Sequence, residues 1–214
     1  MRSVEPIPND PWPHDMGITI EDRPETLLEL LWIREAYDLK TEGDDLPPAL
    51  AVPPGDAGLD APSAEARAEW TSGWPALWVA VVKHTGKEFD PALHERLRQT
   101  ANGSTERLNL LQELVGPSWR DRFGPEALDQ SSYREWSHAT LQAKLASRHD
   151  NLEGNALRRD LDAVVAVWRA GMTKIITIPC NGDYTRQVGD NALLMTEQTI
   201  TSSVSFRRAL GAFG

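Results

Sequence analysis

Prolines are concentrated at the start of this chain, where ten of its 15 prolines fall within residues 1–62. Proline lacks a backbone N–H donor and fixes φ, so it is excluded from helix interiors and central strands. We therefore expect residues 1–20 to be irregular and residues 41–62 to form an extended loop. A wide apolar face between them predicts one amphipathic helix over about 24–39, opened by a capping box from Asp22 to Glu25.

Negative charge is concentrated in the same segment. The chain has 22 lysines and arginines against 32 aspartates and glutamates, a net charge of −10. Residues 1–62 hold four of the cations and 14 of the anions, so the rest of the chain is balanced. Nucleic acids and anionic membranes both attract cationic surfaces, so neither is an expected partner. The sequence thus divides into an acidic, proline-rich arm (1–62) and a single domain (63–214).

The domain is predicted to be mainly α-helical. Apolar spacing and capping residues place helices at about 64–71, 91–101, 104–115, 119–123, 126–147 and 155–170. Ser63, Asp90 and Ser104 are the expected caps of the first three. Gly73 and Pro75 are expected to interrupt the helix that follows Ser63, with Pro75 either kinking one helix or opening a second at its first turn.

The periodicity changes near the C-terminus. Residues 174–178 read KIITI, a β-branched run typical of a strand. Asn181-Gly182 is a strong hairpin signal, and residues 189–191 mark a second turn. These turns predict a three-stranded antiparallel meander over about 174–198, then a closing helix over about 203–213 capped by Ser202 or Ser203. The expected fold class is α+β, with a mainly helical body and a small C-terminal meander.

Two features are candidates for binding a protein partner. Three tryptophans recur at a spacing of four, which places them on one helical face. Tryptophan is enriched in interaction hot spots and can stack on a planar ligand, although the same spacing equally fits a packed core. The acidic arm could attract a basic partner or strap its own core. The candidate partner-binding residues are Trp70, Trp74, Trp78, Glu29, Asp44 and Asp45.

Cys180 is the only cysteine, so no internal disulfide can form. This fits a reducing cytoplasm, as do the polar N-terminus and the lack of any run of about 18 apolar residues. A catalytic thiolate needs a base, which His138 or His149 could supply to Cys180 only through folding. The alternative is an ordinary small residue packed in a hairpin.

His149 and Asp150 are adjacent. The pair resembles the metal-binding dipeptide of HD-type phosphohydrolases, a likeness confined to these two residues. The resemblance implies metals that activate water, with His138 upstream and Asp160 or Asp162 downstream as further ligands. The alternative is a pair that ends a helix. No cofactor is expected from any motif.

These observations favour a non-catalytic interaction protein of the bacterial cytoplasm, of the immunity, antitoxin or adaptor kind. An excess of 17 arginines over five lysines is the compositional ground for a bacterial source. The partner would be another protein or a second copy of the chain. The alternative is a small hydrolase that uses Cys180 or a metal held by His149 and Asp150.

Overall fold

The computed structural model of the chain describes residues 11–43, 45–55, 61–150 and 155–214, with the side chains of 147–150 left out. The described residues form ten helices and four strands. The helices are α1 (Glu25–Ala36), α2 (Ala64–Thr85), α3 (Pro91–Gln99), α4 (Thr105–Val115), α5 (Trp119–Phe123), α6 (Ser131–Asp150), α7 (Ala156–Arg159), α8 (Leu161–Arg169), α9 (Glu197–Thr201) and α10 (Ser203–Gly211). The strands are β1 (Thr19–Glu21), β2 (Lys174–Ile178), β3 (Thr185–Val188) and β4 (Ala192–Thr196).

The strands form one mixed sheet in the order β1-β2-β4-β3. β1, β2 and β4 run parallel, and β3 is antiparallel to β4. The mixed α and β content is confirmed, but the predicted three-stranded antiparallel meander is wrong, because β4 lies between β2 and β3. Only the turn at residues 189–191 joins neighbouring antiparallel strands. β2 and β4 are almost wholly buried, which is typical of central parallel strands covered on both faces.

The Asn181-Gly182 turn does not close a hairpin. Residues 179–184 instead carry the chain past the end of β4, from β2 to β3. Tertiary contacts hold this crossing: the Asn181 backbone N–H donates to the carbonyl of Ala49 (2.8 Å) and its side-chain amide to the carbonyl of Leu50 (3.0 Å). Local turn chemistry was therefore overridden by contacts with a distant loop.

The first 20 residues are not wholly irregular. β1 lies at the edge of the sheet, and the Thr19 N–H donates to the carbonyl of Thr173 at 2.9 Å. The strand falls in the proline-free stretch between Pro13 and Pro24, so its backbone donors are intact.

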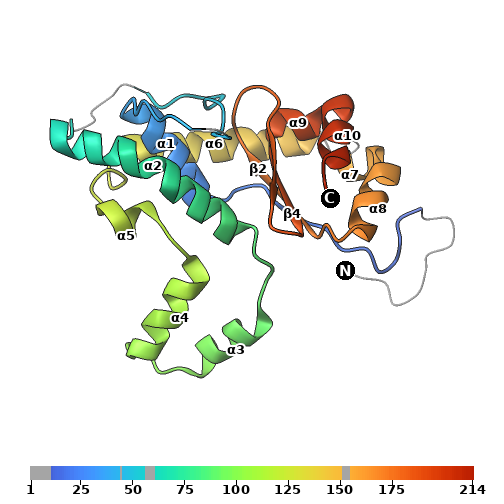
Figure 1. Cartoon of the computed structure of the whole chain (residues 1–214), viewed down its shortest axis with the longest axis horizontal. Coiled ribbons are helices and arrows are strands. Elements are labelled where there is room, and N and C mark those ends of the chain that lie inside the picture. The colour runs from blue at the N-terminus through green and yellow to red at the C-terminus, as the bar shows by residue number, and fades with distance from the viewer. Residues whose placement is uncertain (1–10, 44, 56–60, 151–154) are drawn as a thin grey trace.

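Helices cover both faces of the sheet, giving three layers (Figure 1). Side chains alternate between the faces along a strand. One face packs against α1 and α2 through Ile176, Ile178, Ala192 and Leu194. The other packs against α8 and α10 through Ile175, Leu193 and Met195. The core therefore has two halves, one on each side of the sheet.

A side-chain oxygen caps the start of α2, α3, α4 and α10, which confirms the predicted caps Ser63, Asp90, Ser104 and Ser202. The predicted capping box of α1 is wrong: Pro24 precedes that helix, and no side chain caps it. Glu25 instead pairs with Arg23 at 2.5 Å. Proline suits this position because it donates no hydrogen bond.

α2 runs through both Gly73 and Pro75 as one helix, so neither residue ends it and no second helix opens at Pro75. A β-carbon at Gly73 would lie only 2.7 Å from the ring of Phe123, so the glycine permits close approach of α5. Other boundaries also differ. The helix expected over 126–147 begins at Ser131. The helix expected over 155–170 is broken at Asp160, and β4 ends at Thr196, whose hydroxyl caps α9.

The proline-rich loop lies against the body. The Arg34 guanidinium donates to the carbonyls of Pro47 and Pro48, both at 2.6 Å. The Leu50 N–H donates to the Glu35 carboxylate (2.9 Å), and the Trp136 indole donates to the carbonyl of Val52 (2.8 Å). Side chains of α1 and α6 thus form hydrogen bonds with backbone groups of this loop, which has little regular structure of its own.

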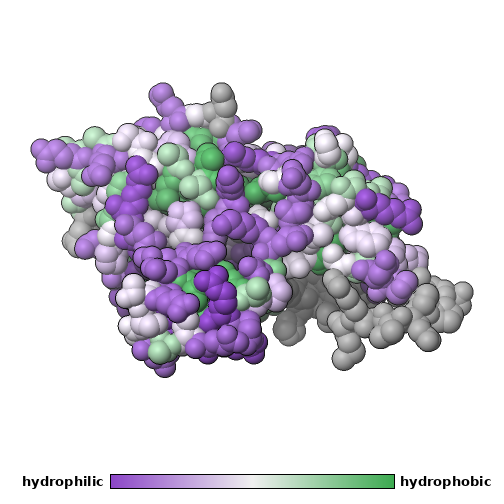
Figure 2. Space-filling model, turned by 60° about the horizontal axis from the view of Figure 1, so that its bottom comes forward, coloured by the Kyte–Doolittle hydropathy of each residue, from purple (hydrophilic) through white to green (hydrophobic). Residues whose placement is uncertain are grey.

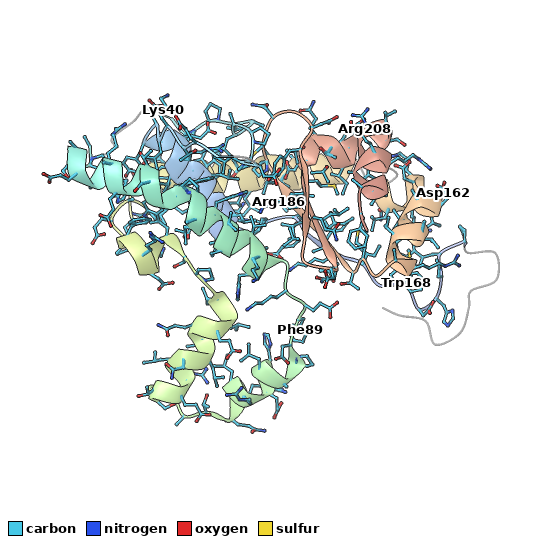
Figure 3. All side chains as sticks on the ribbon, viewed as in Figure 1. Lys40, Phe89, Asp162, Trp168, Arg186 and Arg208 are labelled. Atoms are coloured by element: carbon cyan, nitrogen blue, oxygen red, sulfur yellow. The ribbon has the colours of Figure 1, made fainter. Side chains whose placement is uncertain are left out.

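Helices α3 and α4 pack on each other and project from the body as a lobe (Figure 1). Only Leu93 and Leu110 are buried within these two helices. Figure 2 shows apolar side chains among hydrophilic ones on the surface of the lobe. Phe89 lies where the chain leaves α2 for this lobe (Figure 3), and it is 71% exposed.

Among the residues that the structure describes, no helix has both the length and the apolar character needed to cross a membrane.

Candidate functional site

A cavity of about 430 Å³ opens at the carboxyl ends of the three parallel strands. Asp22 follows β1, Pro179 follows β2 and Glu197 follows β4, and all three line it. Helix α6 closes the opposite side. In open sheets of parallel strands, ligands bind outside the carboxyl ends of the strands. A volume in the range of roughly 300–1,000 Å³ is typical of small-molecule sites.

The walls of the cavity are mainly apolar. Ile20 from β1, Leu28 from α1, Val52 from the proline-rich loop and Ile200 from α9 contribute large aliphatic side chains. Ile20 is 40% exposed and Val52 is 54% exposed, so both present apolar surface to solvent at the cavity. The cavity is therefore open to solvent along an apolar mouth.

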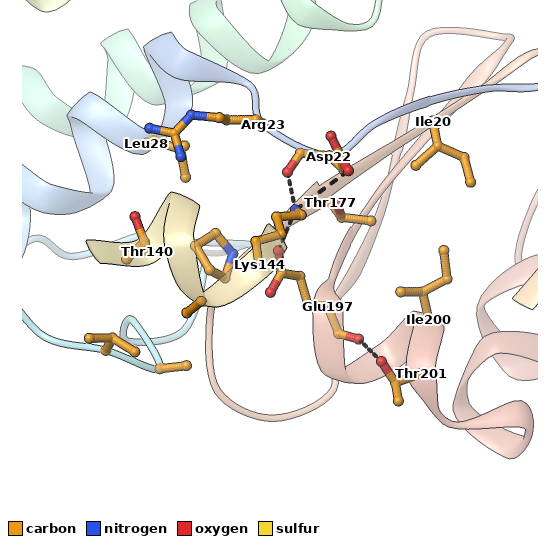
Figure 4. Close-up of a pocket in the computed structure, with 14 residues that line it drawn as sticks. Ile20, Asp22, Arg23, Leu28, Thr140, Lys144, Thr177, Glu197, Ile200 and Thr201 are labelled. Atoms are coloured by element: carbon orange, nitrogen blue, oxygen red, sulfur yellow. Dashed lines mark hydrogen bonds and ion pairs between the residues drawn. The ribbon is translucent and has the colours of Figure 1, made fainter. Parts of the chain in front are cut away.

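Lys144 of α6 crosses the cavity and ends between two acidic residues (Figure 4). Its ammonium donates to the Glu197 carboxylate (2.7 Å) and to the backbone carbonyl of Asp22, and it lies 4.0 Å from the Asp22 carboxylate. All three side chains are partly exposed. One cation thus serves two carboxylates at the cavity wall.

Thr177 supplies a second polar feature. It lies on β2, between β1 and β4, and lines the cavity (Figure 4). The Thr177 residue is 3% exposed, and none of the hydrogen bonds within the described part of the chain uses its hydroxyl. A hydroxyl on the cavity wall that makes no such bond is available to a bound molecule or a water.

The predicted tryptophan stripe is largely internal. Trp74 and Trp78 are both 0% exposed and stack with centroids 5.3 Å apart. The Trp74 indole donates to the carbonyl of Leu30 at 2.8 Å. Trp70 is half-buried and packs edge-on against Tyr37 and Trp119. These rings therefore join α2 to α1 and α5.

Much of the described acidic charge of residues 11–62 is paired within the chain. Glu29 lies 3.3 Å from Arg120, with burial raising the pKa of its carboxyl and Arg120 opposing that rise. Asp45 is exposed, and its carbonyl accepts from the Tyr184 hydroxyl (2.9 Å). Asp44 lies outside the described residues. Further pairs are Glu21–Lys174, Asp22–Lys144, Glu25–Arg23, Glu35–Arg34 and Asp38–Lys40.

Cys180 is 3% exposed and lies in a bridge to Leu50 rather than in a hairpin. Burial raises the pKa of its thiol to about 12, and the nearby Arg34 offsets this only in part. The thiol is therefore protonated at neutral pH, which does not suit a nucleophile. No histidine among the described side chains hydrogen-bonds to it, and His138 is exposed on α6.

His149 and Asp150 end helix α6, and their side chains lie outside the described part of the structure. Among the side chains that are described, no three His, Cys, Asp or Glu residues converge as a metal site would require. The metal interpretation of the pair stays a prediction.

The cavity residues Asp22, Lys144, Thr177 and Glu197 were not singled out by sequence reasoning for any such site. They come from four elements and meet only through the parallel register of β1, β2 and β4. One signal was present: KIITI and ALLMT are nearly continuous apolar runs, and such runs indicate parallel strands buried on both faces. No family model, curated protein or solved structure matches this chain.

Proposed function

We propose that this chain binds a small, mainly apolar molecule with one polar head group, in the cavity at the carboxyl ends of β1, β2 and β4. The Thr177 hydroxyl carries the proposal, because it lies on the wall of an open apolar cavity and makes no hydrogen bond within the described residues. A bound molecule would cover the exposed faces of Ile20 and Val52. Its head group would meet Thr177, Lys144 and the two carboxylates.

Ala143→Trp tests the site, since Ala143 lines the cavity from α6 and an indole would fill part of it. Fragments with aliphatic or aromatic tails and varied head groups would be screened by ligand-observed NMR. We expect the fragments that bind to lose at least tenfold in affinity in the variant, about 1.4 kcal/mol. Ala139→Trp is the matched control, because Ala139 lies one turn earlier on α6 and does not line the cavity. The proposal would be contradicted if no fragment bound, or if the fragments that bind had the same affinity for the Ala143→Trp variant as for the wild type.

A protein-interaction role of the immunity, antitoxin or adaptor kind is the second candidate, and the lobe favours it. Leu108 and Val115 on α4 are 56% and 54% exposed and stand seven residues apart, on one helical face. A projecting helix with an apolar stripe suits recognition by an apolar groove on a partner. The lobe replaces the tryptophans and the acidic arm as the surface best placed for this role.

The lobe is tested by the double variant Leu108→Glu/Val115→Glu. We expect it to lose at least tenfold in affinity for a partner that co-purifies with the wild-type chain, because both carboxylates would have to enter an apolar contact. Val204→Glu is the control, since Val204 is 70% exposed on α10, outside the lobe. Affinity would be measured by surface plasmon resonance. Equal binding by the two variants would remove the lobe from consideration.

A further inference from the structure

We propose that Asn102 is a site of spontaneous deamidation, whereas the fold protects Asn181 from the same reaction. These residues begin the two Asn-Gly pairs of the chain, Asn102-Gly103 and Asn181-Gly182. Asn102 lies in the turn that joins α3 to α4, at the end of the lobe that is remote from the body (Figure 1). The turn is separate from the cavity, so this inference does not depend on the proposed ligand.

Deamidation of an Asn-Gly pair needs no reagent other than water. The backbone nitrogen of Gly103 attacks the side-chain carbonyl carbon of Asn102, and the new N–C bond closes a succinimide ring. The bond from that carbon to the side-chain nitrogen breaks, and this nitrogen leaves as ammonia with the proton of the Gly103 amide. Water then opens the ring at either carbonyl, which leaves aspartate or isoaspartate. Glycine favours the attack, because it has no β-carbon beside the attacking nitrogen.

The structure leaves both reacting groups of the Asn102-Gly103 pair free. Both residues are exposed, and no hydrogen bond in the described part of the chain uses the Asn102 side chain or the Gly103 N–H. The Ser104 N–H closes the turn by donating to the carbonyl of Ala101 at 3.2 Å, and Gly103 has a φ of +79°. The side-chain amide and the attacking nitrogen can therefore approach each other without breaking a contact outside the turn.

The Asn181-Gly182 pair is also exposed, so exposure does not distinguish the two sites. Hydrogen bonds do. The Asn181 side-chain amide donates to the carbonyl of Leu50 (3.0 Å), and the attacking group, the Gly182 N–H, donates to the side-chain oxygen of Gln198 (2.8 Å). The Asn181 N–H donates to the carbonyl of Ala49 at 2.8 Å. Bonds of both reacting groups must open before the ring can close, and the free energy of this local opening lowers the rate.

The aspartate product would change the surface of the lobe. It places a carboxylate two residues before Ser104, whose hydroxyl caps α4. Negative charge is favoured near the N-terminus of a helix, so α4 is expected to keep its structure. The modification would thus add charge to the lobe without unfolding it.

Mass spectrometry of tryptic peptides measures both sites in one sample. Cleavage after lysine and arginine places Asn102 in peptide 99–107 and Asn181 in peptide 175–186, each without another asparagine. The wild-type chain would be incubated at mildly alkaline pH, and the conversion of each asparagine would be followed with time. We expect Asn102 to react at least tenfold faster than Asn181, which corresponds to about 1.4 kcal/mol of opening free energy. Equal rates, or a slower reaction at Asn102, would overturn the proposal.

The same chain in urea is the control for the intrinsic chemistry of the two pairs. Unfolding breaks the hydrogen bonds of Asn181-Gly182, so both pairs should then react at similar rates. If the preference for Asn102 kept its full size in urea, the neighbouring sequence and not the fold would set it, and the inference would be wrong.

Gln198→Ala gives an independent readout, because it releases the Gly182 N–H from an exposed position on α9. We expect the rate at Asn181 to rise severalfold and the rate at Asn102 to stay the same. Gln187→Ala is the matched control and should change neither rate, since Gln187 is also exposed and bonds to Gly189 and Gly214 instead. An unchanged rate at Asn181 in Gln198→Ala would refute the protection that we assign to this contact.

Discussion

Trp74→Ala is expected to destabilise the chain by about 3–5 kcal/mol, the range for removing a large aromatic side chain from a core. Trp74 is 0% exposed, stacks on Trp78 and donates to the carbonyl of Leu30. The Arg34 guanidinium also lies over its ring, 5.3 Å from the centroid. The substitution therefore removes packing, a hydrogen bond and a cation–π contact at once. Urea unfolding followed by circular dichroism would measure the change.

Phe89→Ala is the matched control for Trp74→Ala, because it also removes an aromatic ring. Phe89 is 71% exposed and contacts chiefly His94, at a centroid distance of 4.3 Å. Substitutions at such surface sites usually change stability by less than about 0.5 kcal/mol. Similar losses in the two variants would mean that α2 does not pack on α1 as described.

The helices of this chain were largely predictable because their signals are local. Ser63, Asp90 and Ser104 each cap a helix from a position that the sequence alone identifies. The α1 helix was predicted from its wide apolar face, and its side chains Leu27, Leu30 and Trp32 are 0% exposed. The division between an arm and a domain at residue 62 stays a prediction, although α1 belongs to the same core cluster as α2.

The sheet was mispredicted because strand pairing is not local. Asn181-Gly182 favours a hairpin, yet β2 pairs in parallel with β4 along its whole length. The composition of the two strands carried the better signal. KIITI and ALLMT have few polar residues that could face solvent. An antiparallel meander with one solvent-exposed face instead requires apolar and polar residues to alternate along each strand. The continuous apolar character of these two strands predicts a sheet covered on both faces, whereas the Asn181-Gly182 turn predicts a hairpin.

The same error in strand pairing is the reason why the candidate site could not be predicted. Asp22, Thr177 and Glu197 come together because three parallel strands end at one edge of the sheet. An antiparallel meander would have placed β3 between β2 and β4 and left out β1, so the ends of these three strands could not be inferred to adjoin. The sequence could not identify Lys144 as a residue of this site, because the position of Lys144 depends on how α6 packs across that edge of the sheet.

Asp160 links the helices on the far side of the sheet, and it also explains why α7 and α8 are separate. Its carboxylate is 1% exposed and accepts hydrogen bonds from the Ser203 hydroxyl (2.5 Å), Arg207 (2.7 Å) and Arg159 (2.7 Å). Two of these donors belong to α10. The helix expected over 155–170 breaks where this carboxylate turns toward α10.

Asp160→Ala is expected to cost about 2–3 kcal/mol at pH 7, at or below the lower end for breaking a buried ion pair, because both arginines remain partly exposed to water. Urea unfolding would measure the loss. Asp162→Ala is the matched control: Asp162 also pairs with Arg207, but its side chain is 74% exposed, so little change is expected. Equal effects of the two substitutions would show that Asp160 does not anchor α10.

The contribution of Asp160 should also depend on pH in a defined direction. Burial alone would raise the pKa of its carboxyl, but hydrogen bonds from Ser203, Arg159 and Arg207 outweigh burial and hold the pKa below its usual value. A carboxyl whose pKa is lower in the folded state stabilises fully above its unfolded pKa of about 3.9, and this stabilisation is lost as pH falls further. The stability difference between wild type and Asp160→Ala should therefore be constant from neutral pH down to about 5 and shrink below about 4. A difference that stayed constant through this acidic range would show that the charge of Asp160 contributes nothing, and that only the volume of its side chain holds α10 in place.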